Sequence, residues 1–451
     1  MPPNSAPAYH ARAATPPLAT PDAVRSEVEF AYAATALVRE KLDAAGIRPS
    51  ELQTWDALRL IPPTTRAEYR ARFPADVVAG TASLAEPFVV YSRSSGTDMD
   101  RQTSVAHSFD LARRMFDALT VNPELARVLR RKKGNRGVRL HAPNCSDVEC
   151  SSPTITLEDR ILPSGELVLP AMHDLMATPP DMLDRAIGEI QMWSPAYLSC
   201  DAERLAQLLR RCEELGIAEL PGDALLLEYT QITEHARAQA EAFFAGLPIA
   251  STISMSEVGL VAVECPKGAL HLNAASFWAE LVTDGRPTRA GECGELYVTT
   301  IGDRLAPRIR YMTGDVYRLL DPCACGHEFP AVAFEGRRRD LVRLDGLVAL
   351  TPRTADAVVG TPPGLRHYRL QQVGDRFATF HYVAEGGPDA GWEARLREDL
   401  ARRLPGCRLD VEAAGYIPSE RSGKFLACTS AFSAELERRA PGRETLTEAA
   451  A

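Results

Sequence analysis

Three cysteines and one histidine in two short segments of the chain could together bind a metal ion. Cys265 precedes His271 by a few residues, and Cys323 and Cys325 form a Cys-x-Cys-Gly turn further along. Thiolate sulfur and imidazole nitrogen are the ligands that Zn²⁺ prefers, and four of them complete its tetrahedral coordination. His327 is an alternative fourth ligand, although three ligands from one turn would be cramped. The set predicts a closed, structural zinc site.

An aspartate beside a glycine turn is the second feature with evident chemistry. Asp315 ends the segment RYMTGD at 310–315, and Arg337 follows it further along the chain. A carboxylate can accept two hydrogen bonds from the hydroxyls of a ribose, and charge-assisted bonds of this kind are strong. The guanidinium of Arg337 could reach the same ribose or a phosphate. By itself such a turn is more often an ordinary surface turn, so its meaning depends on its neighbours.

A serine-rich loop is the third feature. Residues 92–97 read SRSSGT and follow the apolar run 88–91. In a strand-to-helix loop, the backbone N–H groups and hydroxyls of such a segment can bind phosphate oxygens. The hexapeptide alone is more often a surface turn than a phosphate site.

Alternating helices and apolar strands must position these residues. The runs 88–91 and 224–227 predict buried strands, and apolar periodicity predicts helices over 24–45, 110–119, 202–215 and 236–244. This alternation favours an α/β fold. From residue 296 short strands and turns dominate, and a helix is predicted over 392–404. A small α+β unit is therefore expected at the C-terminal end.

Composition excludes several classes of protein. The chain has 451 residues and a formal net charge of −9, which argues against a nucleic-acid or membrane-surface role. No stretch reaches the ~20 apolar residues of a membrane span, and the N-terminus lacks the order of a signal peptide. Ten scattered cysteines suit a reducing compartment. We expect a cytoplasmic protein that is a monomer or homodimer.

Five motifs occur in the order typical of the adenylate-forming superfamily of acyl-CoA synthetases. They are Ser94-Ser95-Gly96-Thr97, Ser254-Met255-Ser256-Glu257, Tyr311-Met312-Thr313-Gly314-Asp315, Gly336-Arg337 and Ser422-Gly423-Lys424. The chain resembles most the branch of phenylacetate–CoA ligases and coenzyme F390 synthetases. Residues 60–66 (LIPPTTR) resemble the early LPxTTK segment of that branch, and residues 291–300 (GECGELYVTT) resemble its GExGELVxTT strand. The resemblance spans about residue 25 to 430.

The resemblance implies a two-domain enzyme. An N-terminal adenylation domain of mixed sheets and helices would span 23–336, and a small mobile α+β lid domain would span 337–438. Residues 1–22 and 439–451 are expected to be a flexible arm and tail. Arg339 falls at the pivot of the lid, where the family more often has Asp or Lys.

The resemblance also implies a reaction. ATP and a carboxylic acid would form an acyl-adenylate and release pyrophosphate, and a thiol, usually that of coenzyme A, would then take the acyl group. Mg²⁺ would be held by Glu257, and the branch often carries a structural zinc where Cys265, His271, Cys323 and Cys325 occur. The implied catalytic residues are Lys424 and Glu257. The implied ATP or AMP contacts are Ser94, Ser95, Gly96, Thr97, Glu228, Tyr229, Ser254, Met255, Ser256, Asp315, Arg337 and Lys424. The implied substrate contacts are Trp193, Tyr197, Ile253 and Ser254.

Some positions depart from the family pattern. Asp98 and Asp100 place carboxylates beside the expected triphosphate, where the family has neutral or basic groups. The pair Ile253-Ser254 replaces an aromatic residue and a glycine, and residues 140–150, with His141, follow the pattern poorly. Three hypotheses stay open. The chain could be an acid–CoA ligase for an aromatic acid, an adenylating enzyme that transfers to a carrier-protein thiol or an amine, or an inactive homologue that binds an acyl or nucleotide ligand.

Overall fold

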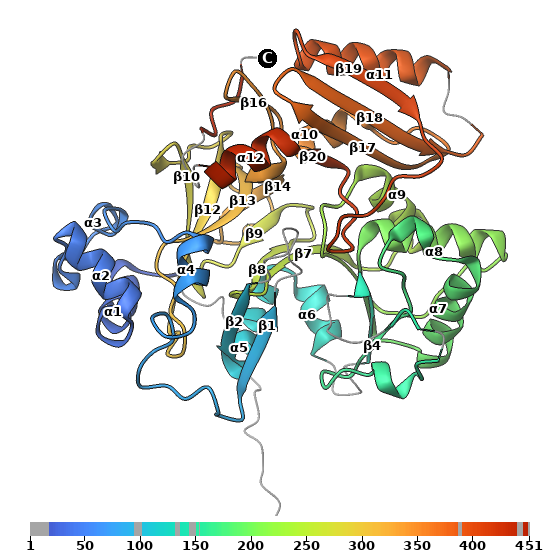
Figure 1. Ribbon diagram of the computed structural model, residues 1–451. Helices are drawn as coiled ribbons and strands as arrows, with labels where there is room; N and C mark the ends of the chain where they lie inside the picture. The colour runs from blue at the N-terminus through green and yellow to red at the C-terminus, as the bar shows by residue number, and fades with distance from the viewer. Residues whose placement is uncertain are drawn as a thin grey trace, which may run out of the picture.

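A twelve-stranded mixed sheet forms the centre of the molecule (Figure 1). The computed structural model describes residues 18–93, 102–130, 136–143, 150–152, 154–386, 390–439 and 445–449. The strand order is β11-β10-β12-β13-β14-β9-β8-β7-β6-β5-β3-β4. Its parallel half consists of β3 (Gly137–Leu140), β4 (Glu166–Val168), β5 (Tyr197–Cys200), β6 (Leu225–Leu227) and β7 (Ile249–Met255). Its antiparallel half consists of β8 (Gly259–Glu264), β9 (Leu270–Leu272), β10 (Phe277–Thr283), β11 (Arg286–Pro287), β12 (Cys293–Thr300), β13 (Tyr311–Leu319) and β14 (Ala331–Arg337).

Helices surround this sheet and bury its apolar side chains. The parallel strands share one core with α7 (Pro180–Trp193), α8 (Ala202–Glu214) and α9 (Glu234–Phe243), and leucines at 205, 208 and 209 line the inner face of α8. The other helices of this part are α1 (Pro21–Ala34), α2 (Ala36–Ala45), α3 (Trp55–Arg59), α4 (Arg66–Arg72), α5 (Ser108–Ala118) and α6 (Pro123–Leu129). Among the described residues, no helix combines the length and apolar composition that a membrane crossing needs.

A C-terminal unit, residues 338–439, contains its own sheet and core. It begins with a short helix, η6 (Arg338–Asp340), and the hairpin of β15 (Val342–Leu344) and β16 (Leu347–Leu350). Its four-stranded sheet has the order β19-β18-β17-β20. The strands are β17 (Leu365–Gly374), β18 (Phe377–Ala384), β19 (Arg408–Ala413) and β20 (Cys428–Ser430), with helices α10 (Pro352–Val359), α11 (Ala390–Arg403) and α12 (Ala431–Arg439). The predicted fold class, α/β with a small C-terminal α+β unit, is confirmed.

Two local predictions differ from the structure. The single helix predicted over 24–45 is two helices, because Thr35 is extended and its hydroxyl donates to the carbonyl oxygen of Ala31 at 2.7 Å. A β-branched threonine that bonds its own helix in this way favours a break. The segment 18–22 is not a free arm, since α1 begins at Pro21 and the amide of Ala19 bonds to Ala274.

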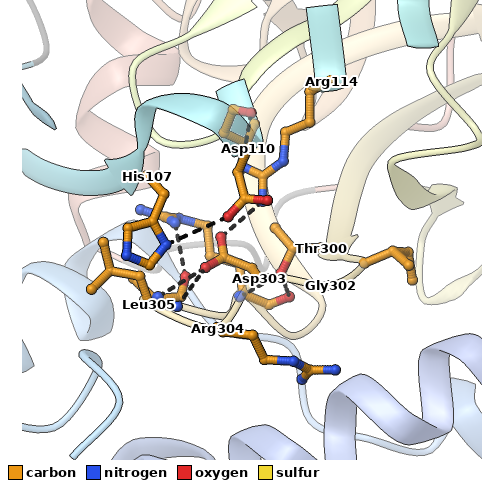
Figure 2. A network of polar contacts seen from close by, with 12 residues as sticks. His107, Asp110, Arg114, Thr300, Gly302, Asp303, Arg304 and Leu305 are labelled. Carbon is orange, nitrogen blue, oxygen red and sulfur yellow. Dashed lines mark hydrogen bonds and ion pairs between the residues drawn. The ribbon is translucent and has the colours of Figure 1, made fainter. Parts of the chain in front are cut away.

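A buried ion pair connects α5 to the loop that follows β12. Arg114 is fully buried and donates to the Asp303 carboxylate at 2.8 Å and to the carbonyl oxygen of Val258 at 3.2 Å. Figure 2 shows Asp303 also accepting from the backbone of its own loop, as in the bond from the Leu305 amide at 3.1 Å. Because both charges are paired and hydrogen-bonded, their burial is tolerated. Arg114 thereby connects α5 to Val258, the residue that follows Glu257.

The C-terminal segment 445–449 is docked rather than free, which differs from the flexible tail expected there. Val348 exchanges backbone hydrogen bonds with Thr447 and Ala449, so the segment extends the edge of β16. Leu446 is 2% exposed, and Glu448 forms an ion pair with Arg318 of β13 at 2.8 Å. The segment therefore connects the C-terminal unit to the large sheet. The sequence of the segment did not predict this contact, because the residues that bury Leu446 lie far from it in the sequence.

Replacing Leu446 with alanine should release this segment. The side chain packs with Cys293, Val316, Leu341 and Val348, and truncating a buried leucine costs about 2 to 5 kcal/mol. We expect proteolytic cleavage within residues 436–449 to become at least about tenfold faster. Leu347→Ala, at a partly exposed leucine on the same hairpin, is the matched control. Equal cleavage rates for the two variants would show that Leu446 does not anchor the segment.

Candidate active site

The carboxyl ends of the parallel strands bring the main candidate residues to one edge of the sheet. His141 follows β3, Glu228 follows β6, and Ser256 and Glu257 follow β7 directly. Parallel strands in an α/β sheet end at a common edge, and ligands of such sheets bind there. β7 is also where the parallel half meets the antiparallel half. Segments that are distant in the sequence thus form one site.

Glu257 is buried and kept ionised by arginines. Its side chain is 3% exposed and accepts hydrogen bonds from Arg66 at 2.9 Å, from the hydroxyl of Ser256 at 3.0 Å and from the hydroxyl of Tyr311 at 3.3 Å. Burial alone would raise the pKa of Glu257, but Arg66 and Arg308 outweigh it and hold the pKa below its usual value. An ionised carboxylate at this place suits Mg²⁺, which prefers oxygen ligands.

Arg66 is a site residue that the sequence prediction omitted. It is the first residue of α4, whose start is held by a capping box: the Thr65 hydroxyl accepts from the Glu68 amide, and the Glu68 carboxylate accepts from the Thr65 amide. The helix thereby aims the guanidinium at Glu257. The signal was present in the segment 60–66, whose last residue is basic in the family as well.

Asp315 and Arg337 face each other across two antiparallel strands. They are directly paired between β13 and β14, and Arg337 Nε lies 3.5 Å from Asp315 Oδ1. Burial raises the pKa of Asp315, and Arg337 and Arg66 offset part of that rise. Gly314 has a φ of +76°, a conformation that glycine adopts freely, and this shapes the turn in β13 that carries Asp315. The predicted pair is therefore brought together.

Lys424 enters this site from the C-terminal unit. It lies in the connection between β19 and β20, and its Nζ donates to the carbonyl oxygen of Tyr229 at 2.9 Å. Its positive charge also contributes to the pKa of Asp315, which places both groups in one electrostatic environment. Lys424 and Arg337 therefore surround the site with positive charge, as an anionic ligand would require.

Contacts between the C-terminal unit and the large sheet hold the Lys424 loop. Buried Arg204 of α8 donates to the carbonyl oxygen of Gly423 at 2.9 Å. The Asp174 carboxylate accepts from the hydroxyl of Tyr416 at 2.6 Å and from the amide of Ser419 at 3.2 Å. Gly423 has a φ of +77° and sits so close to Ala142 that a side chain would clash. These contacts fix the Lys424 loop against the large sheet.

A group of polar side chains surrounds Glu228, the residue before Tyr229. Glu228 accepts hydrogen bonds from the hydroxyls of Ser199 and Thr252, the latter at 2.9 Å, and lies 3.5 Å from His141. His141, in the stretch that follows the family pattern poorly, belongs to this group through its position at the carboxyl end of β3. Ile253, Ser254 and Met255 continue along β7 beside Glu257, with Ser254 exposed.

Trp193 and Tyr197 lie apart from this group along the parallel strands, and their role as substrate contacts stays a prediction. Trp193 ends α7 and donates its indole N–H to the carbonyl oxygen of Gly137 at 3.1 Å. Tyr197 begins β5, and its ring occupies the space beside Gly137. Both lie at the amino ends of the parallel strands, the opposite edge from Glu228 and Glu257. The sequence predicted that both residues lie next to a strand, but it did not predict at which end of the strand they lie.

The serine-rich loop lies partly outside the described residues. Ser94, Ser95, Gly96, Thr97 and the following residues to 101, with Asp98 and Asp100, are not described, and neither is Cys145. The loop connects two antiparallel strands, β1 (Val89–Arg93) and β2 (Thr103–His107), and α5 follows only after β2. The expected strand-to-helix setting is therefore a hairpin. Gln102, at its end, donates to the hydroxyl of Tyr311 at 3.1 Å, next to Glu257.

The four predicted zinc ligands are brought together. The ligand atoms of Cys265, His271, Cys323 and Cys325 all lie within 4.8 Å of one another. Cys265 Sγ lies 3.8 Å from Cys323 Sγ, and Cys325 Sγ lies 3.3 Å from His271 Nε2. The Nδ1 of His271 lies 2.8 Å from the carbonyl oxygen of Phe329, which favours the tautomer with Nε2 free to bind a metal.

The alternative ligand His327 is turned away from this cluster. Its Nε2 lies 3.3 Å from the hydroxyl of Thr120, and its Nδ1 accepts a hydrogen bond from the amide of Phe329 at 3.2 Å. The backbone amides of Cys325 and His327 instead donate to the sulfurs of Cys323 and Cys325, both at 3.5 Å. Strand β8 separates the cluster from Glu257 by roughly 20 Å, so the cluster cannot touch a ligand at the site.

The relatives found by sequence comparison are phenylacetate–coenzyme A ligases. No known family's sequence profile matches the chain. A phenylacetate–coenzyme A ligase of Thermus thermophilus is 24% identical over 358 residues, which cover 76% of this chain and 75% of that protein. The phenylacetate–coenzyme A ligase of Escherichia coli is 26% identical over 357 residues, covering 76% of each. The predicted resemblance is thereby confirmed.

The fold agrees with that of a solved CoA-ligase structure. A crystal structure of 2-hydroxyisobutyryl-CoA ligase, in the postadenylation state with its adenylate, superimposes with a TM-score of 0.68 and 16% sequence identity. The alignment covers 93% of this chain and 90% of that structure. Both the large sheet and the C-terminal unit therefore belong to the fold of adenylate-forming CoA ligases.

Proposed function

We propose that this chain, a homologue of phenylacetate–coenzyme A ligases, activates a carboxylic acid with ATP and transfers the acyl group to coenzyme A. A carboxylate oxygen would attack the α-phosphorus of ATP, and the bond from that phosphorus to the pyrophosphate oxygen would break. The thiolate of coenzyme A would then attack the acyl carbon, and AMP would leave. The relatives favour an aromatic or similarly apolar acid.

The observation that carries the proposal is that Asp315 faces Arg337 and shares its electrostatic environment with Glu257 and with Lys424 of the C-terminal unit. Asp315 would accept the ribose hydroxyls, with Arg337 beside it. Ser256 would contact phosphate or the acyl-adenylate, and the resemblance implies that the segment of Glu228 and Tyr229 would face adenine. Lys424 would bridge the attacking carboxylate and the α-phosphate, where negative charges must be neutralised and aligned.

Two metals belong to the proposal. Magnesium would be held by Glu257, and when bound it neutralises charge on the phosphates. Arg66 now occupies one oxygen of Glu257 at 2.9 Å, so this arginine would have to share the carboxylate or move to a phosphate. Zinc would be held by the four-ligand cluster, which joins β8 and β9 to the β13–β14 connection and has no open coordination position. Its role would be structural.

The lid movement is also a proposal. The C-terminal unit, approximately the predicted lid domain 337–438, is joined to the large sheet near Arg339. In the family the lid rotates between adenylation and thioester formation, and here rotation would break the bonds of Asp174, Arg204 and Tyr229 to the Lys424 loop. These contacts hold the state in which Lys424 faces the site, and that state suits the first half-reaction.

The test is carboxylate-dependent ATP–pyrophosphate exchange with a panel of acids that includes phenylacetate, benzoate, short hydroxy acids and fatty acids. We expect exchange with one class of acid and the corresponding CoA thioester when coenzyme A is added. Exchange without a thioester would indicate a carrier-protein thiol or an amine as the acceptor. No exchange with any acid would contradict the enzyme and favour the inactive homologue.

A further inference from the structure

We propose that Tyr229 is a positioning residue for Lys424: its carbonyl oxygen and its ring together hold the ammonium group at the site. The catalytic consequence rests on the proposed function, whereas the contact itself can be tested without catalysis. Resemblance to the family places an adenine contact at this position. The geometry assigns the side chain to the lysine instead.

Two contacts from one residue reach the same ammonium group. Lys424 Nζ donates to the carbonyl oxygen of Tyr229 at 2.9 Å and lies 4.4 Å from the centroid of the Tyr229 ring. An ammonium within about 6 Å of an aromatic ring is attracted by the negative π face. The ring therefore supports a cation in a site that is partly removed from water, and the carbonyl oxygen fixes its direction.

The backbone of Tyr229 is in an unusual conformation for an aromatic residue. Its φ is +80°, in the region that favours glycine. The residues on each side hold it there: the Glu228 amide bonds to the carbonyl oxygen of Cys200, and the Thr230 hydroxyl donates to Asp201 at 3.0 Å. Strain maintained by its surroundings is a frequent mark of a functional position. With this backbone, both the carbonyl oxygen and the ring of Tyr229 meet Lys424.

The ring itself is fixed by His141. The two rings are stacked with centroids 5.1 Å apart and an interplanar angle of 8°. Burial, with Arg139, Arg204 and Lys424 nearby, holds the pKa of His141 well below its usual range. The imidazole is thus neutral and does not repel the lysine. His141 and Tyr229 together form a rigid platform beneath the ammonium group.

The loop backbone and the lysine side chain are held by different residues. Arg204 holds the backbone through the carbonyl oxygen of Gly423 at 2.9 Å, and Asp174 accepts from the amide of Ser419 at 3.2 Å, whereas the ammonium group of Lys424 is held by Tyr229. Loss of the Tyr229 ring should therefore leave the loop docked and free the lysine side chain. This separates a positioning role from a purely structural one.

The first test measures the contact directly. The chain has only five lysines, at 41, 132, 133, 267 and 424, so the rate of acylation of each by an amine-reactive ester can be followed by mass spectrometry. Exposed Lys267 is the internal reference. Tyr229→Leu keeps an apolar cover without the π face, and Tyr229→Phe keeps the ring. We expect Leu to raise the labelling of Lys424 relative to Lys267 by several-fold, and Phe to leave it unchanged.

The second test separates the two half-reactions. Tyr229→Leu should lower kcat of pyrophosphate exchange by roughly tenfold, the size of a partly desolvated cation–π contact, with KM for ATP little changed. Thioester formation from supplied acyl-adenylate should be preserved, and Tyr229→Phe should restore exchange. A rise in KM for ATP alone would assign the ring to adenine and overturn the inference.

Failure of this inference differs from failure of the proposed function. Equal labelling of Lys424 in the wild type and in Tyr229→Leu overturns the positioning role, whatever the activity. A wild-type chain without exchange, but with labelling that responds to Tyr229→Leu, overturns the enzyme and leaves the contact established. If the Leu variant does not fold, as circular dichroism would show, Tyr229→His at the same place supplies the comparison with a weaker π face.

Discussion

Lys424→Ala should abolish most of the ATP–pyrophosphate exchange, lowering its rate by at least about a hundredfold. In the proposed reaction two anions approach each other, the acid carboxylate and the α-phosphate. A preorganised cation between them stabilises the transition state more than the ground state, and removing one such donor costs about 3 to 4 kcal/mol. The measurement is the initial rate of exchange with the best acid of the panel.

Two controls give this result its meaning. Arg402→Ala removes an exposed cation of α11 in the same C-terminal unit and should leave exchange unchanged. Thioester formation by Lys424→Ala from supplied acyl-adenylate should be largely retained, because no carboxylate attacks phosphorus in that step. Exchange by Lys424→Ala above about half of the wild-type rate would show that the lysine does not act in adenylation. Loss of both half-reactions would indicate a damaged fold.

Removal of one zinc ligand should have the largest effect on stability. We expect the purified protein to hold about one equivalent of zinc and Cys323→Ser to lose it, because a structural site needs its four ligands. Binding of zinc contributes several kcal/mol to such folds. The variant should unfold at a clearly lower temperature, and a strong chelator should lower the thermal midpoint of the wild type in the same way.

The control for the zinc prediction is Cys407→Ser, which changes a half-buried thiol that is distant from the cluster in the sequence and belongs to the C-terminal unit. It should keep the metal and unfold near the wild-type temperature. Less than about a tenth of an equivalent of zinc in the wild type would contradict the site. Because the cluster is far from Glu257, exchange activity should decline only as the protein unfolds, and not in a separate chemical step.

The proposed zinc cluster and the proposed nucleotide site share a strand connection. Strand β13 carries Asp315 and leads into the turn of Cys323 and Cys325, and β14 returns to Arg337. Asp315 of β13 lies opposite Arg337 of β14. The cluster would therefore hold the outer end of this pair of strands. We accordingly expect Cys323→Ser to weaken nucleotide binding only in proportion to the loss of fold.

Local patterns in the sequence predicted the candidate residues and the class of fold. Motif residues such as Glu257, Asp315 and Lys424 could be identified because short segments with a required residue at a required place are local properties. Apolar periodicity is also local, so α8 and α9 were predicted within a residue or two of their observed ends. The ligand types of the zinc cluster follow from the same kind of pattern.

The contacts between these residues became visible only in the folded structure. Trp193 and Tyr197 lie at the amino ends of the parallel strands, which could not be predicted, because a strand signal does not tell which edge of the sheet a residue reaches. Arg66 meets Glu257, and Tyr229 meets Lys424, across long stretches of chain. Leu446 finds a pocket built by strands far from it in the sequence. Such contacts depend on the packing of distant elements, and no local pattern of residue types encodes them.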